Sequence, residues 1–114
     1  RRTEIDLLLD ATEAEPYPVI IMGDINMSAA SADYRYLSEH YTDSFADSGW
    51  GLGTTFPNFT IFIPELPVLW AAPSVMRLDY IFIDEQFYST DSEVIYQGVS
   101  DHFPVKTALR WAGN

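Results

Sequence analysis

The feature that most constrains this chain is an apolar run, residues 19–22, which stops at Gly23 and is followed by Asp24 and Asn26. Four successive apolar residues are too few for a helix core but suit a β-strand that is covered on both faces. Gly23 permits a sharp turn where we expect this strand to end. An extended backbone places Asp24 and Asn26 on one side. The run therefore predicts a buried strand that delivers a carboxylate and an amide to a sheet edge, where ligand sites of α/β sheets collect.

The residues before this strand predict an amphipathic helix. Over residues 3–14, apolar side chains such as Ile5 and Leu9 recur at helical spacing, and Pro16 and Pro18 end the pattern. A helix, a short loop and a buried strand form the second part of a strand–helix–strand unit. We therefore expect the preceding strand to lie upstream, in a longer domain of which this chain is a piece.

The residues that follow predict a second helix. Ser31 is suited to cap a helix that runs to about residue 39, with Tyr34 and Leu37 facing inward. Residues 41–48 mix polar and aromatic side chains and are consistent with a short strand or an irregular passage. Residues 49–53 are glycine-spaced and are interpreted as an ordinary loop, because they do not join a strand to a helix.

The second half of the chain predicts β-structure. Residues 77–84, 87–97 and 103–109 have the β-branched, aromatic or alternating composition of strands. Residues 59–63 are also interpreted as core strand. The proline-rich residues 66–73 leave two interpretations open, a structural connection or an aromatic lip around a substrate.

Composition and charge narrow the function classes. The chain has 114 residues, which is enough for one small domain, and its 47% hydrophobic content supports a packed core. It contains 17 Asp plus Glu against 6 Lys plus Arg, so its formal net charge is -11. This sign repels nucleic-acid backbones and argues against a general DNA binder. Cysteine is absent, which excludes disulfides, and no transmembrane segment is expected.

Three groups of polar residues lie at or inside the expected strands. They are Asp24 with Asn26, then Asp79, then the consecutive Ser100, Asp101 and His102. Each alone has an ordinary explanation as a turn, a cap or a structural hydrogen bond. Asp79 lies within a strand and therefore requires a partner.

Taken together and in order, these groups resemble a known family. Residues 23–26 (GDIN), 77–82 (RLDYIF) and 100–105 (SDHFPV) are similar to the three carboxyl-terminal motifs of the endonuclease/exonuclease/phosphatase, or DNase I-like, family. Tyr34 and residues 54–57 (TTFP) also resemble common features of that family. The resemblance implies an α/β (α+β) fold. The expected structure is half of a four-layer sandwich, with one mixed, mostly antiparallel β-sheet and helices packed on one face.

The resemblance also implies a metal-dependent hydrolysis of phosphoesters, usually with Mg²⁺ or alternatively Mn²⁺. In that reaction Asp24 would position or deprotonate the attacking water, and Asn26 would contact the scissile phosphate. Asp79 would orient His102, His102 would stabilise the transition state, and Asp101 would lie at a metal position. Preorganised amide, imidazolium and metal groups suit the charge that develops in phosphoryl transfer.

The chain also departs from the family pattern, because it holds nothing that resembles the amino-terminal half. That half supplies the principal metal-binding glutamate, and the glutamates of this chain lie on or beside expected helices. His40, the other histidine, is expected to be a surface or capping residue. We therefore expect the isolated chain to be nearly inactive. We also expect it to associate with itself through a sheet face or edge that the amino-terminal half would otherwise cover.

The sequence is consistent with three functions. The first is the carboxyl-terminal half of a phosphoesterase acting on a phosphodiester or phosphomonoester, with duplex DNA disfavoured by the net charge. The second is a lipid-head-group phosphodiesterase of the same family, favoured if residues 66–73 form an exposed apolar loop near membrane lipid. The third is a noncatalytic, self-associating α/β module.

Overall fold

The computed structural model describes residues 2–24, 31–58, 65, 74 and 76–112. Asn26, the expected strand at 59–63 and the apolar segment 66–73 lie outside this part of the chain. Three helices and five strands follow in order: α1 (Arg2–Glu13), β1 (Ile20–Asp24), α2 (Ala32–Ser38), β2 (Thr42–Asp43), α3 (Ser44–Ser48), β3 (Asp79–Ile83), β4 (Phe87–Val94) and β5 (Val105–Trp111).

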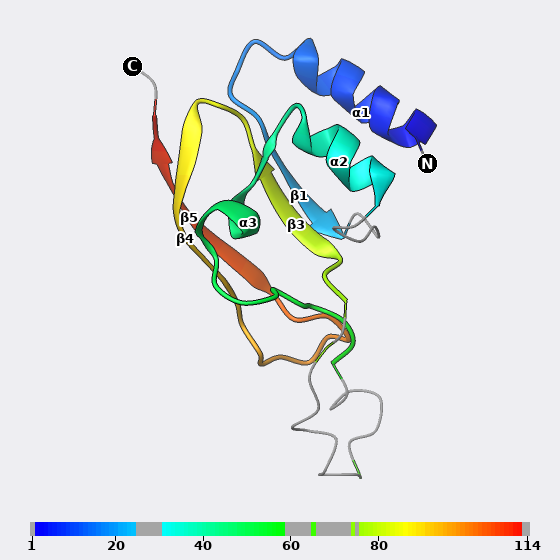
Figure 1. Ribbon diagram of the computed structural model, residues 1–114, viewed down its shortest axis with the longest axis vertical. Helices are drawn as coiled ribbons and strands as arrows, with labels where there is room; N and C mark the ends of the chain where they lie inside the picture. The colour runs from blue at the N-terminus through cyan, green and yellow to red at the C-terminus, as the bar shows by residue number, and fades with distance from the viewer. Residues whose placement is uncertain (1, 25–30, 59–64, 66–73, 75, 113–114) are drawn as a thin grey trace.

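The described strands form two sheets. One has the order β1-β3-β2 and the other pairs β4 with β5, and all of these strand pairs are antiparallel. The expected α/β class and antiparallel pairing are confirmed. The strands are divided between two sheets where one was expected, because the β-rich second half pairs β4 with β5 locally (Figure 1).

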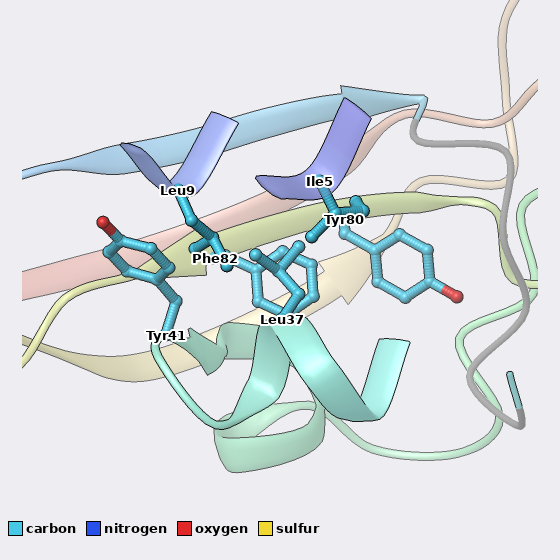
Figure 2. Packing of buried hydrophobic residues seen from close by; sticks show 6 residues of the cluster. All are labelled: Ile5, Leu9, Leu37, Tyr41, Tyr80 and Phe82. Carbon is cyan, nitrogen blue, oxygen red and sulfur yellow. The ribbon is translucent and has the colours of Figure 1, made fainter. Parts of the chain in front are cut away.

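Helices α1 and α2 cover one face of the first sheet (Figure 1). Ile5 and Leu9 lie one helical turn apart on α1, so both point to the sheet, where they are 4% and 3% exposed. Leu37 of α2 meets them over Phe82 of β3, and both of these side chains are 0% exposed (Figure 2). The apolar stripes predicted for these two helices therefore form the core.

The start of α2 is also as predicted. The Oγ of Ser31 accepts a hydrogen bond of 3.1 Å from the backbone N–H of Tyr34. This bond satisfies one of the unpaired N–H groups at the beginning of the helix.

The prediction that β1 is buried on both faces is wrong for this chain. Alternate side chains of a strand point to opposite faces, so Ile21 packs on the helix side while Ile20 and Met22 face the other way. Ile20 is 38% exposed and Met22 is 67% exposed. The helices cover only one face of β1, which leaves its second apolar face open to solvent.

Gly23 does not end the strand as expected. It pairs with Tyr80, and β1 continues to Asp24. Gly23 has a φ of 140°, a backbone conformation that other residues rarely adopt, so the glycine permits an irregular position within the strand.

Residues 41–48, expected to be a strand or an irregular passage, form β2 followed by the short helix α3. The carboxylate of Asp43 caps this helix by accepting from the backbone N–H groups of Phe45 and Ala46, at 3.2 and 3.5 Å. Among the described residues, no helix has the length and apolar composition needed to cross a bilayer.

Candidate active site

The register of β1 and β3 brings two carboxylates together. The strands pair antiparallel from Ile20 opposite Ile83 to Asp24 opposite Asp79. The last residue of β1 therefore faces the first residue of β3. Two like charges directly opposite each other in a sheet repel, so a nearby positive group or cation stabilises this arrangement.

His102 lies beside both carboxylates. Its Nδ1 is 2.6 Å from the Oδ2 of Asp79, and its Nε2 is 3.6 Å from the Oδ2 of Asp24. The His102 and Asp79 side chains are 22% and 21% exposed, whereas that of Asp24 is 46% exposed. Ligand atoms of the three residues lie within 4.8 Å of one another. Asp24, Asp79 and His102 are far apart in sequence, and the fold brings them together as a cluster of two carboxylates and one imidazole.

The environment favours the charged form of His102. The hydrogen bond to Asp79 is the largest influence and raises the pKa of His102 above its ordinary value of 6.5. Partial burial opposes this effect, while the negative charges of Asp79, Asp24 and Asp101 add to it. Because a carboxylate only accepts hydrogen bonds, Nδ1 donates to Asp79, and Nε2 is left to donate on the side of Asp24.

The ring of His102 is also held by an aromatic contact. The Phe56 ring lies against it with centroids 4.8 Å apart and planes tilted by 48°. The next residue, Phe103, donates its backbone N–H to the carbonyl oxygen of Thr55 at 2.8 Å. Residues 54–57, which the sequence singled out only by resemblance, therefore support the imidazole.

An open pocket adjoins this group. It is lined by residues of β1, β3, the loop that carries His102, and the start of β5: Met22, Gly23, Asp79, Tyr80, Ile81, Ser100, His102, Phe103, Pro104 and Val105. His102 and Asp79 thus border a space that a small substrate group can enter.

Among the other residues singled out in the sequence, Asp101 and His40 do not belong to this cluster in the described part of the chain. Asp101 is exposed and accepts a 3.3 Å hydrogen bond from the Oγ of Ser100, and it is not one of the three residues whose ligand atoms converge. Asn26 lies outside the described residues. His40 is exposed and 3.4 Å from a carboxylate oxygen of Glu13, which confirms the prediction of a surface residue.

A second polar cluster was not foreseen from the sequence. Asp43, which is 5% exposed, forms an ion pair with Arg77 and accepts a 2.6 Å hydrogen bond from the Tyr34 hydroxyl. The Arg77 guanidinium also lies over the Tyr80 ring, 4.7 Å from its centroid. This cluster joins α2, β2 and β3. The RLDY motif contained one signal for it, since an arginine just before a buried strand requires an anionic partner.

The cluster has its own electrostatic consequences. Burial, and then the neighbouring Asp43, raises the pKa of Tyr34 above its ordinary value of 10.0. Burial is also the main reason that the pKa of Tyr80 rises to about 12. Both phenols are therefore neutral at physiological pH. Tyr34 acts here as a hydrogen-bond donor to Asp43 rather than as a member of the His102 group.

The fold is shared with known structures. The chain superimposes on an endonuclease/exonuclease/phosphatase protein from Bacteroides vulgatus with a TM-score of 0.76 and 21% identity, covering 96% of this chain and 43% of that one. A functionally unknown conserved protein from Enterococcus faecalis V583 gives a TM-score of 0.74 and 23% identity, covering 94% and 42%.

A mannosyl-6-phosphatase from Bacteroides thetaiotaomicron VPI-5482 gives a TM-score of 0.70 and 23% identity, covering 93% of this chain and 42% of that one. The chain therefore spans well under half the length of these relatives. No curated protein matches the sequence significantly.

The sequence profile of the Endonuclease/Exonuclease/phosphatase family matches residues 1–102, which includes Asp24, Asp79 and His102. The match covers most of the chain and agrees with the superimposed folds. The chain belongs to the endonuclease/exonuclease/phosphatase family.

Proposed function

We propose that this chain is the carboxyl-terminal part of a metal-dependent phosphoesterase domain. The observation that carries the proposal is the position of His102, hydrogen-bonded through Nδ1 to Asp79 at 2.6 Å with its Nε2 on the side of Asp24. A carboxylate behind an imidazole fixes its tautomer and favours its charged form, which suits a group that stabilises developing negative charge.

Each residue then has a distinct task. Asp79 orients His102, and the Nε2 of His102 donates to an oxygen of the phosphate as charge builds in the transition state. Asp24, the more exposed carboxylate, holds the attacking water and accepts its proton. The proposed contact of Asn26 with the scissile phosphate is carried over from the family resemblance of residues 23–26.

A divalent cation fits this site only in part. Mg²⁺ and Mn²⁺ prefer oxygen ligands, and the exposed carboxylate of Asp24 offers them. Asp79 and the Nδ1 of His102 are engaged with each other, and a charged imidazole is not a metal ligand. We therefore propose that Asp24 faces the cation through the attacking water that it holds, and that Asp101 lies at a metal position, as the resemblance implies. The principal ligand, a glutamate, would come from the rest of the domain. When bound, such a cation neutralises phosphate charge and lowers the pKa of bound water.

The partner proposed for this chain is the amino-terminal part of its own domain. The solved relatives are more than twice as long as the matched region, and the open face of β1 carries Ile20 and Met22. Apolar side chains gathered on one sheet face favour burial against a partner. In isolation, we expect two copies of the chain to cover this face instead.

The substrate proposed is a small phosphomonoester or phosphodiester. The formal charge of -11 disfavours duplex DNA, because binding to a phosphate backbone depends on lysine and arginine. The mannosyl-6-phosphatase relative supports a sugar phosphate as one substrate of this class. The lipid alternative depends on residues 66–73 and is tested by measuring whether phospholipid vesicles protect the fluorescence of Trp70.

The direct test is an assay of the complete protein that carries this sequence. We expect it to hydrolyse para-nitrophenyl phosphate or its bis-nitrophenyl diester with Mg²⁺ or Mn²⁺, and to lose that activity when a chelator is added. The isolated chain should show negligible turnover. Failure of the complete protein to hydrolyse either ester with either metal would overturn the proposal and favour the noncatalytic module.

A further inference from the structure

The buried side chain of Asn58 contacts the loop that presents His102. Asn58 is 1% exposed, and its Nδ2 donates to the carbonyl oxygen of Ser100 at 2.8 Å and to that of Gly98 at 3.3 Å. Its backbone N–H donates to the carbonyl oxygen of Asp101 at 2.8 Å. Three carbonyl groups of a single loop thus receive hydrogen bonds from the same residue.

Within the described part of the chain, residues 98–101 have little apolar support of their own. Residues 98–101 are exposed and belong to no helix or strand, and Val99 is 91% exposed. Segments with little apolar burial open at low free-energy cost unless polar contacts hold them. Buried amide donors, by contrast, strongly favour their hydrogen bonds, because a buried donor without an acceptor is energetically unfavourable. Asn58 therefore supplies a fixed point to which the loop is attached.

The attachment lies close to the imidazole. Asp101, whose carbonyl group is held, directly precedes His102, and the Oγ of Ser100 accepts from the His102 backbone N–H at 3.2 Å. The bond between His102 and Asp79 is 2.6 Å long, so a shift of the loop by about 1 Å would break it. Misplacements of that size cost about a hundredfold in enzyme rates.

We propose that Asn58 is a positioning residue, which fixes loop 98–101 so that His102 meets Asp79 and Asp24. The reaction in which His102 would be used rests on the proposed phosphoesterase function, but the positioning itself does not. This role requires the amide of asparagine. Aspartate has no Nδ2 donors and would place a carboxylate against the carbonyl oxygens, and alanine would remove both hydrogen bonds.

The first test is made on the 114-residue chain by NMR. In the wild type, the Nδ1 proton of His102 should give a downfield signal that exchanges slowly with water. In Asn58→Ala and Asn58→Asp this signal should broaden or disappear, and amide exchange at residues 98–103 should accelerate at least tenfold, while the amides of β3 keep their protection. Ser89→Ala is the matched control, because it removes a buried hydroxyl whose hydrogen bonds, 2.9 Å to Asp47 and 3.3 Å to the carbonyl oxygen of Ser44, go to α3 and not to the loop.

Two results would overturn the inference. One is an unchanged Nδ1 signal and unchanged loop exchange in either folded Asn58 variant. The other is loss of protection throughout the chain in both variants, since a residue that only positions the loop leaves the core intact.

The second test uses the complete protein. Asn58→Ala should lower kcat by roughly tenfold to a hundredfold with little change in KM, and Ser89→Ala should change neither. If the complete protein proves inactive towards phosphoesters, the proposed function fails, and the NMR comparison still decides the role of Asn58. An unchanged kcat in Asn58→Ala would overturn the inference in the active enzyme.

Discussion

Strands β1 and β3 are both apolar, five residues long and paired to each other along their length, yet the structure buries them differently. β3 has a strand on each edge, and its helix-facing Tyr80 and Phe82 are 2% and 0% exposed. β1 lies at the sheet edge, with Met22 67% exposed on the face opposite the helices. Apolar sequence therefore shows where burial is favourable, whereas neighbouring elements decide where it occurs.

The same contrast separates the two site carboxylates. Asp79, on the central strand, is 21% exposed and bound to His102 at 2.6 Å, whereas Asp24, on the edge strand, is 46% exposed and 3.6 Å from the same ring. The central strand thus holds a preformed pair, and the edge strand offers a carboxylate that water and substrate can reach. This division agrees with the roles proposed for the two residues.

The largest expected effect is on stability. Phe82→Ala should lower the free energy of unfolding by about 3–5 kcal/mol, because it removes a ring that is 0% exposed from the core under α1 and α2. Met22→Ala should change it by no more than about 0.5 kcal/mol in the monomeric chain. Urea unfolding followed by circular dichroism measures both. Equal losses of unfolding free energy in the two variants would contradict the difference in burial between β3 and β1.

The second prediction concerns the open face of β1. The isolated chain should self-associate, and Met22→Lys should shift it towards monomer, because a buried Met side chain contributes about 1.5–3 kcal/mol and an unpaired buried charge is unfavourable. Sedimentation velocity measures the change.

Leu7→Lys is the matched control for that experiment. Leu7 is 65% exposed on α1, close to the 67% of Met22, and the two substitutions change the net charge equally. Leu7→Lys should leave association intact. A wild-type chain that stays monomeric at high concentration would contradict the proposed interface.

The third prediction distinguishes the two carboxylates through the pKa of His102. Asp79→Asn should lower this pKa more than Asp24→Asn, because the hydrogen bond to Asp79 is the largest cause of its elevation. NMR titration of the imidazole in chelator-treated buffer measures both shifts. An equal or larger effect of Asp24→Asn would contradict the assignment of Asp79 as the main partner.

The smallest expected effect is the pH dependence of stability. Since the folded-state pKa of His102 lies above 6.5, the folded chain binds this proton more tightly than the unfolded chain. The resulting stabilisation is fully present below pH 6.5 and should be lost as the pH rises through the folded-state pKa. Urea unfolding across this range should show the loss in the wild type and a smaller one in Asp79→Asn. If stability rises over the same pH range in the wild type, but not in His102→Ala, the proposed stabilisation by protonated His102 is wrong.

Local patterns predicted much of the fold. Helices α1 and α2, the Ser31 cap and the strand beginning near Asp79 followed from apolar spacing and capping chemistry, which act over a few residues. The need of Asp79 for a partner was also predicted. Its contact with His102 was expected only from the family resemblance, because contacts between residues so far apart depend on tertiary packing.

Helix α3 and the exposure of β1 could not be predicted from local sequence patterns, because both depend on contacts with other parts of the fold. α3 has five residues and depends on its Asp43 cap and on hydroxyl contacts with the second sheet, such as the 2.9 Å bond between Ser44 and Thr107. Such a short helix is stabilised by tertiary contacts more than by its own sequence. The composition of β1 is that of a strand with both faces covered, so it did not identify β1 as the exposed strand, although an open sheet face or edge was expected from the absence of the amino-terminal half.

The central claim is that His102 acts on a phosphate ester, and hydrolysis by the complete protein tests it most directly. With Mg²⁺ or Mn²⁺ and a nitrophenyl phosphate, His102→Ala should lower the rate by about a hundredfold or more, because it removes a preorganised donor. His40→Ala, which removes the exposed histidine beside Glu13, should retain the wild-type rate. Full activity in His102→Ala, or an equal loss in both variants, would contradict the account.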